Sequence, residues 1–171
     1  HLDFAAIQDA QDMRLRIREH KGLHAPISHL GHNVKLGRGG IREIEFFTQT
    51  RQIISGGRDP ELRVAGTVAG LTKLAEKNWI TTGYADALIS DYRALRDVEH
   101  RVQMIADQQT HTLPESEEGF AQLAALAGST PSDYARHIVE RLSRVKELTE
   151  GLYEQSGEPA PDAVVPEPFA E

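Results

Sequence analysis

The chain has 171 residues, contains no cysteine and carries a formal net charge of -7. The lack of cysteine excludes disulfides and thiolate metal sites, and the acidic balance argues against a general nucleic-acid-binding protein. No apolar run approaches the roughly 20 residues that a membrane-spanning helix needs. These properties are typical of a cytoplasmic protein with one main domain and a substantial core.

The first predicted element is a helix over residues 4–20. Asp3 is a suitable N-cap, and four apolar side chains recur on one face, at Ala6, Ala10, Met13 and Ile17. The second half of this helix is basic. A solvated face near the helix C-terminus explains these cations, and a surface facing an anion is the alternative.

Residues 22–33 form a predicted loop that contains His24, His29 and His32 among turn-forming residues. With His20 these histidines number four, which raises the question of a zinc site. Zinc sites hold three or four ligands on fixed elements with supporting partners, and this loop offers only the spacing. We therefore predict ordinary loop histidines and no metal site.

Residues 34–47 read VKLGRGGIREIEFF and place a glycine-rich turn before a helix predicted over residues 40–55. Such a helix start presents backbone N–H groups and the positive end of the helix dipole, which suit phosphate or carboxylate. Alternatively, the glycines only supply the backbone conformations of the turn. The candidate residues near an anion or nucleotide are Lys35, Arg38, Gly39, Gly40 and Arg42, and the candidate supporting carboxylates are Glu43 and Glu45.

A third helix is predicted over residues 62–77. Gly66 and Gly70 each weaken it by about 1 kcal/mol relative to alanine, so we expect close helix packing at these positions. Trp79 and Ile80 follow the helix, and both are predicted to fill the core.

The longest predicted helix starts at Thr81 or Thr82 and runs through about residue 106, with an apolar stripe sustained for about three heptads. Glu99 lies beside this stripe. A half-buried carboxylate there needs a cation, and Arg42 or Arg51 is the predicted partner.

Residues 107–114 connect this helix to a short helix that ends near Ala127. The connection is predicted to be either a plain loop or a segment that docks another domain, and His111 is a weak candidate for a catalytic base. The last helix begins within the capping-box-like sequence Thr130-Pro131-Ser132-Asp133, with the proline as its first residue, and covers about residues 131–152. Proline and acidic residues in 156–171 predict a disordered tail or linker.

The fold class predicted from these elements is all-α, a mostly antiparallel helical bundle of about six helices within residues 1–155. Short connections favour antiparallel neighbours. Only residues 33–36 have the pattern of a brief extended segment, which would complete a sheet of another domain.

The glycine segment resembles the block K-L-G-x-G-G-I-R-E-I-E-F of bacterial glutamine synthetase adenylyltransferases, the enzymes that attach AMP to glutamine synthetase and also remove it. The resemblance continues in the same order through SGGRDPEL at 55–62, RDVEHR at 96–101 and QQTHTLP at 108–114. The isoleucine after the paired glycines and the Thr-Leu-Pro ending are more similar to the N-terminal, adenylyl-removing half of the family.

The resemblance implies a helical domain that follows a nucleotidyltransferase head, in which an Asp-x-Asp pair binds magnesium and ATP or AMP is the nucleotide. This chain contains no Asp-x-Asp. We therefore expect no catalytic residue here and no activity from the chain alone. The implied partners are the adjacent nucleotidyltransferase domain, glutamine synthetase and the PII signalling protein.

Two functions follow from the resemblance. In the first, the bundle supports the active site and the surface that receives glutamine synthetase. In the second, it is a non-catalytic regulatory module that relays PII and glutamine signals between the two heads. Convergence of Lys35, Arg38 and Arg42 on an open surface favours the first, and their burial in internal ion pairs favours the second.

Overall fold

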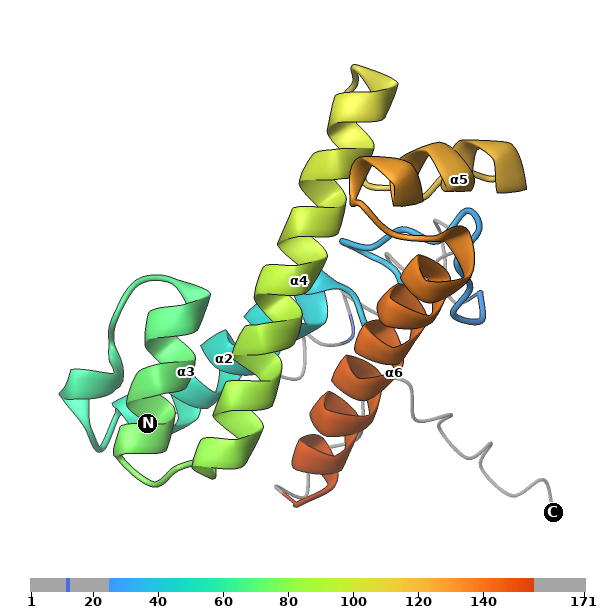
Figure 1. Cartoon of the computed structure of the whole chain (residues 1–171). Coiled ribbons are helices and arrows are strands. Elements are labelled where there is room, and N and C mark those ends of the chain that lie inside the picture. Colours follow the sequence, from blue (N-terminus) through green and yellow to red (C-terminus); the bar gives the residue numbers. More distant parts are fainter. Residues whose placement is uncertain (1–11, 13–24, 156–171) are drawn as a thin grey trace, which may run out of the picture.

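A computed structural model describes residue 12 and residues 25–155 (Figure 1). The predicted first helix, apart from residue 12, and the predicted tail at 156–171 lie outside the described residues. The described elements in chain order are α2 (Ile41–Gly56), the 3-10 helix η1 (Pro60–Leu62), α3 (Thr67–Glu76), α4 (Thr82–Ala106), α5 (Glu117–Leu126) and α6 (Pro131–Gln155). The described residues contain helices and no strand, which confirms the all-α fold class.

The helices pack as a bundle in which α2 is the central element. The helices α4 and α6 lie side by side and antiparallel, and α5 crosses near one end of α4 (Figure 1). The helix α2 contacts α3, α4 and α6, and its side chains Ile41, Ile44 and Phe47 are fully buried. These contacts place α2 at the centre of the bundle.

The start of α3 differs from the prediction. Residues 60–62 form the separate helix η1, because the Asp59 side chain accepts a hydrogen bond from Glu61 N at 3.1 Å. Gly66 then adopts a φ of +90° as the N-cap of α3, so this glycine lies outside the helix in which it was predicted. Gly70 does lie within α3, and a Cβ there would be 2.7 Å from Thr48 Cγ2. The close helix packing predicted at Gly70 is confirmed.

Two predicted core positions were wrong. Trp79 is 40% exposed, whereas its neighbour Ile80 is buried as predicted. Asn78 has a left-handed φ of +59°, and this turn directs only one of the two following side chains inward. Ile105, the last residue of the apolar stripe predicted for α4, is 38% exposed, because the end of α4 projects beyond the helices that cover the rest of the stripe (Figure 1).

Hydroxyl side chains cap three helices. Thr81 accepts from Tyr84 N at 3.2 Å at the start of α4, and Ser116 accepts from Gly119 N at 3.1 Å before α5. The Thr130 hydroxyl accepts from Asp133 N at 3.2 Å, directly before the first residue of α6. Such caps satisfy N–H groups that have no partner inside the helix. The capping sequence predicted for α6 is confirmed, and α4 starts at Thr82, one of the two predicted residues.

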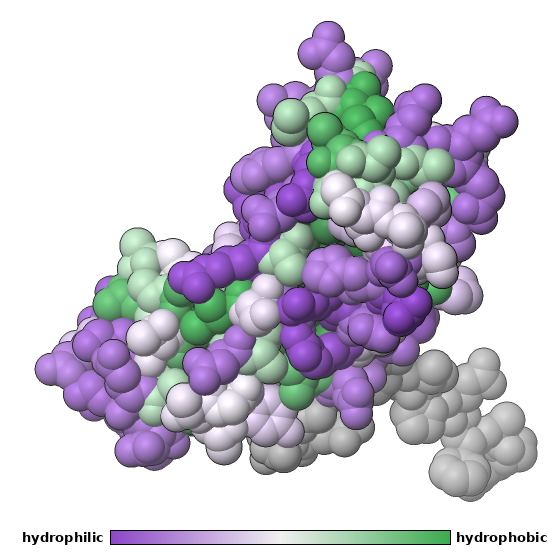
Figure 2. Space-filling view, in the orientation of Figure 1, coloured by the Kyte–Doolittle hydropathy of each residue, from purple (hydrophilic) through white to green (hydrophobic). Residues whose placement is uncertain are grey.

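The surface of the bundle is mainly hydrophilic on the face drawn in Figure 2, with a hydrophobic area at the projecting end of α4. Met104 in the last turn of α4 is 70% exposed. Among the described helices, none has the combination of length and hydropathy that a membrane span requires.

Candidate functional site: the glycine turn before α2

Asn33 organises the backbone of the glycine turn. Its side-chain oxygen accepts hydrogen bonds from Lys35 N at 3.1 Å and Leu36 N at 2.8 Å. Its carbonyl accepts from Gly37 N at 2.8 Å, and Gly40 N donates to Gly37 O at 3.0 Å. An asparagine that bonds the following backbone in this way stabilises a compact turn.

The glycines of the turn are required by close packing. Gly39 has a left-handed φ of +68°, and a Cβ at this position would lie 1.9 Å from Leu142 O of α6. A Cβ at Gly37 would be 2.5 Å from Asn33 O, and one at Gly40 would be 2.7 Å from Val34 O. Side chains cannot occupy these positions without moving backbone, so the turn sits directly on α6.

The first N–H groups of α2 already have backbone acceptors. Ile41 N donates to Val34 O at 2.9 Å and Arg42 N donates to Lys35 O at 3.0 Å. Glu43 N donates to Gly40 O at 3.1 Å. These bonds satisfy the amides that a helix start usually leaves open. An anion at this turn would therefore be held by side chains and by the helix dipole.

The three cations of the candidate site differ in their partners. Arg42 is exposed, and its Nη1 lies 3.0 Å from Glu45 Oε2, one helical turn away. Lys35 and Arg38 are half-buried. Within the described part of the chain, neither forms an ion pair, and the buried Arg38 Nε has no hydrogen-bond acceptor. The turn therefore contains two cations that have no carboxylate partner among the described residues.

The two candidate carboxylates have different surroundings. Glu45 is partly exposed and pairs with Arg42. Glu43 is only 3% exposed and lies in the first turn of α2, where the helix dipole stabilises negative charge. Glu43 is therefore an interior residue, whereas Glu45 faces the surface with Arg42.

The connection between α4 and α5 packs against the residues that lead into the turn. Asn33 and Thr112 form an antiparallel bridge. Val34 N donates to His111 O at 2.9 Å, Leu113 N donates to His32 O at 2.8 Å, and the flanking Gly31 N donates to Pro114 O at 3.1 Å. The predicted extended segment therefore pairs with another part of this chain at Asn33.

Glu99 is a buried carboxylate with two partners. It is 2% exposed, and its Oε2 accepts from Arg96 Nη1 at 2.7 Å. Its Oε1 lies 2.6 Å from Nδ1 of His111, in the connection after α4. The predicted partner Arg42 was wrong, because Arg42 pairs with Glu45. The other predicted partner, Arg51, places its guanidinium 5.4 Å from the centre of the Phe47 ring. The three-residue spacing of Arg96 and Glu99 was a signal that the sequence offered, whereas the contact with His111 crosses a loop.

The histidines of the loop before the turn have structural contacts. His32 is 6% exposed, and its Nε2 donates to Arg38 O at 2.9 Å, so the ring holds the backbone of the turn. His29 Nε2 lies 3.2 Å from Glu117 Oε1. His20 and His24 lie outside the described residues. In the described residues, no group of three or more His, Asp or Glu side chains is placed to hold a metal ion.

The part of α6 that contacts the turn is bonded to a buried carboxylate of α4. Asp91 is fully buried, and its Oδ1 accepts from Arg141 Nη1 at 2.9 Å. Its Oδ2 accepts from Arg144 Nε at 2.8 Å, and hydrogen bonding to Asp91 raises the pKa of Arg144 above its ordinary value. Arg141 also donates to Ser90 Oγ at 2.8 Å. Sequence reasoning missed this cluster, although it fixes α6 at the level where Gly39 meets Leu142.

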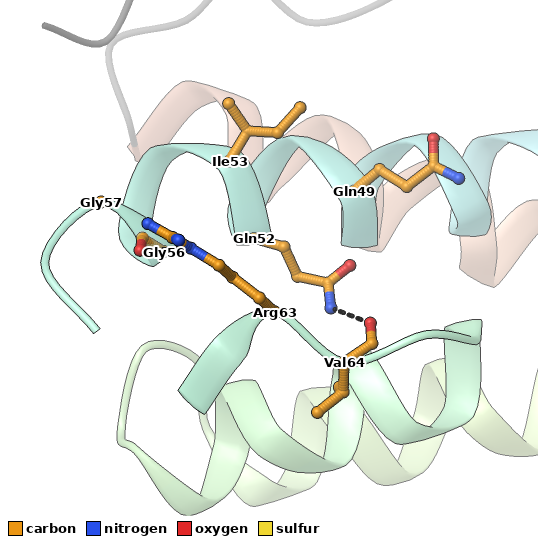
Figure 3. Close-up of a pocket in the computed structure, with 7 residues that line it drawn as sticks. All are labelled: Gln49, Gln52, Ile53, Gly56, Gly57, Arg63 and Val64. Carbon is orange, nitrogen blue, oxygen red and sulfur yellow. Dashed lines mark hydrogen bonds between the residues drawn. The ribbon is translucent and has the colours of Figure 1, made fainter. Parts of the chain in front are cut away.

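A separate open pocket of about 480 Å³ lies at the other end of α2 (Figure 3). Its polar groups are largely engaged within the chain. Arg63 Nε donates to Gly56 O at 3.1 Å, and the Gln52 amide donates to Leu62 O at 2.9 Å and Val64 O at 3.0 Å. The remaining lining residues are Gln49, Ile53 and Gly57. This pocket offers fewer unpaired charges than the glycine turn.

Comparison with known proteins gives the family. The chain is 52% identical over 159 residues to a protein of Brucella melitensis named bifunctional glutamine synthetase adenylyltransferase/adenylyl-removing enzyme, covering 92% of this chain and 16% of that protein. A protein of the same name in Rhodopseudomonas palustris is 49% identical over 167 residues, which cover 97% of this chain and 17% of that protein. Another, in Mesorhizobium japonicum, is 56% identical over 128 residues, which cover 75% of this chain and 13% of that protein. The resemblance found in the motifs is confirmed.

The chain spans about one sixth of the length of these relatives. The family model described as GlnD PII-uridylyltransferase matches residues 11–154, which include every described helix except the last residue of α6. The chain therefore belongs to the GlnD PII-uridylyltransferase family.

Proposed function

We propose that this chain is the helical domain of a bifunctional glutamine synthetase adenylyltransferase/adenylyl-removing enzyme of the cytoplasm. The support is identity of about 50% to relatives of that name over most of the chain. The family model names a uridylyltransferase, but the relatives matched at this identity carry the adenylyl name. In this role the chain is part of an enzyme that transfers AMP to glutamine synthetase, or removes it with phosphate, and thereby regulates nitrogen metabolism.

The glycine turn contributes cations to the nucleotide or phosphate bound by the adjacent head. One observation carries this assignment, namely that Lys35 and Arg38 have no carboxylate partner in the described residues and that Arg38 Nε is buried without an acceptor. Phosphate oxygens supply the acceptors that such side chains lack. Nucleotidyl transfer concentrates negative charge on phosphorus-bound oxygens, and fixed cations stabilise it.

The roles within the site divide between contact and support. Lys35 and Arg38 face the anion, with Arg42 at the edge, where Glu45 holds it. Gly39 allows the turn to approach α6, and Gly40 allows the turn to pack closely on its own backbone. Glu43 stabilises the start of α2 from inside. These residues fit an anion and do not fit magnesium, since the chain contains no Asp-x-Asp. The metal would therefore be bound by the head.

The alternative is a non-catalytic module that relays PII and glutamine signals between the two heads. The observation in its favour is the exposed apolar end of α4, where Met104 is 70% exposed and Ile105 is 38% exposed. A regulatory partner that covers this end would act without any contact to the nucleotide.

The test is phosphate-dependent release of AMP from adenylylated glutamine synthetase by the full-length enzyme. Arg38→Gln and Lys35→Met remove the two cations of the turn that lack a carboxylate partner in the described residues, and Arg63→Gln at the other end of α2 is the matched control. We expect a loss of about 10-fold or more for the first two variants, an unchanged melting temperature, and no loss for the control. Full activity in the first two, or loss only together with stability, would leave the regulatory module as the better assignment.

A further inference from the structure

The connection after α4 supports both ends of the glycine turn through the paired segments 31–34 and 111–114. On one side, His111 O accepts from Val34 N, and Val34 O accepts from Ile41 N at the start of α2. On the other side, His32 O accepts from Leu113 N. These bonds join the connection to the beginning of α2 and to the residue that precedes the turn.

His32 links the connection to Arg38. Its Nε2 donates to Arg38 O at 2.9 Å. Val34 links the connection to the other two cations. Lys35 directly follows Val34, and Lys35 O accepts from Arg42 N at 3.0 Å. The backbones of all three candidate cations are therefore tied to residues that the connection holds.

The connection is in turn fixed to α4 by one side chain. His111 reaches inward, and its Nδ1 lies 2.6 Å from Glu99 Oε1. The imidazole is 25% exposed and Glu99 is 2% exposed. Nδ1 lacks a well-aligned hydrogen bond, so the contact is a close approach between imidazole and carboxylate. Arg96 holds the other oxygen of Glu99 at 2.7 Å, which leaves Oε1 to His111.

We propose that His111 and Glu99 are positioning residues for the cations of the glycine turn. The pair fixes the connection on α4, the connection fixes residues 32–34, and these set Lys35 and Arg38 for an anion of the phosphate class. This inference rests on the proposed anion-binding function of the turn. It assigns a function to the buried Glu99 and to His111, neither of which forms an ion pair with Lys35, Arg38 or Arg42.

The first measurement is amide hydrogen exchange in this chain, which requires no activity. His111→Leu fills a similar volume without a polar atom, and His111→Asn places an amide nitrogen near the position of Nδ1. We expect His111→Leu to accelerate exchange at Val34 and Leu113 by about 10-fold or more because their bonds open locally. His111→Asn should stay near the wild-type rates, as should His100→Leu, a control at an exposed histidine of α4. Unchanged exchange in His111→Leu would overturn the inference.

The second measurement is steady-state removal of AMP by the full-length enzyme with inorganic phosphate as the varied substrate. We expect His111→Leu to raise the KM for phosphate by about 5-fold or more, because binding weakens when charged donors are misplaced. The KM for adenylylated glutamine synthetase and the melting temperature should change little, and His111→Asn should restore the KM for phosphate. Loss of activity only through unfolding, or equal loss in both variants, would overturn the positioning role.

Arg38→Gln separates failure of this inference from failure of the proposed function. If Arg38→Gln raises the KM for phosphate and His111→Leu does not, only the positioning role is overturned. If Arg38→Gln leaves that KM unchanged, the turn does not bind the anion, and the proposed function and the positioning role are both overturned. A raised KM in both variants, together with rescue by His111→Asn, supports the inference.

Discussion

The two ends of α2 both carry glycines, but for different physical reasons. At the first end, a Cβ at Gly39 would lie 1.9 Å from a backbone oxygen of α6. At the second end, a Cβ at Gly56 would have its nearest neighbour, the flexible Arg63 Cγ, at 3.5 Å. At Gly66, ten residues further along the chain, no atom lies within 4 Å of an added Cβ, but any residue other than glycine would be strained at the φ of +90°. Glycine at a helix boundary therefore marks packing in one place and chain conformation in another.

The charged side chains near the two ends of α2 also differ in their partners. Near the second end, Lys77 pairs with Glu61 and lies 3.8 Å from Asp59 Oδ2, and hydrogen bonding with Lys77 lowers the pKa of Glu61. At the first end, Lys35 and Arg38 have no such partners in the described residues. Arg63 at the second end also has no carboxylate partner in the described residues, but its Nε donates to Gly56 O, whereas Arg38 Nε in the turn is buried without an acceptor.

The largest effect is expected from Gly39→Ala, which removes the close contact between the turn and α6. The added Cβ must displace backbone, and the positive φ adds its own strain, so we expect a loss of about 4 kcal/mol in the free energy of unfolding. Thermal and urea unfolding measure this loss. A change below about 1 kcal/mol would show that the turn can move away from α6 at little cost.

Asp91→Asn should have the next largest effect, because it weakens the α6 wall on which the turn packs. Removing the charge leaves Arg141 and Arg144 without their carboxylate, and we expect a loss of about 3 kcal/mol. Asp97→Asn, at an exposed position of the same helix, is the control and should change stability by less than about 0.5 kcal/mol. Equal effects of the two substitutions in urea unfolding would contradict a role of Asp91 in holding α6.

Gly66→Ala tests the conformational demand at the start of α3, where an added Cβ would meet no steric obstacle. A φ of +90° is unfavourable for alanine, and we expect a loss of about 1.5 kcal/mol. Gly83 in the first turn of α4 also has nothing within 4 Å of an added Cβ, and its φ lies outside the positive range. Gly83→Ala should therefore leave stability unchanged or raise it slightly. A neutral Gly66→Ala would mean that this turn readily changes its conformation.

The sequence predicts what depends on neighbouring residues and fails where distant segments meet. The helix α4 was predicted closely because its Thr81 cap and its apolar stripe are local signals. The contact between Gly39 and Leu142, and that between Glu99 and His111, depend on how separate elements pack. The sequence therefore indicated the glycine turn as a candidate site, but it could not indicate what supports the turn or which cations stay unpaired.

Gly56→Ala should have a small effect of the opposite sign to Gly39→Ala. Gly56 is the last residue of α2 and is helical, and the added Cβ meets only ordinary van der Waals contact with Arg63. Alanine restricts the unfolded chain more than glycine does, so we expect a gain of about 0.5 kcal/mol in the free energy of unfolding. Chemical denaturation of Gly56→Ala and Gly39→Ala under the same conditions measures the expected gain and the expected loss in the free energy of unfolding. Loss of stability at Gly56 comparable to that at Gly39 would show that both ends of α2 are close-packed, and the contrast between them would fail.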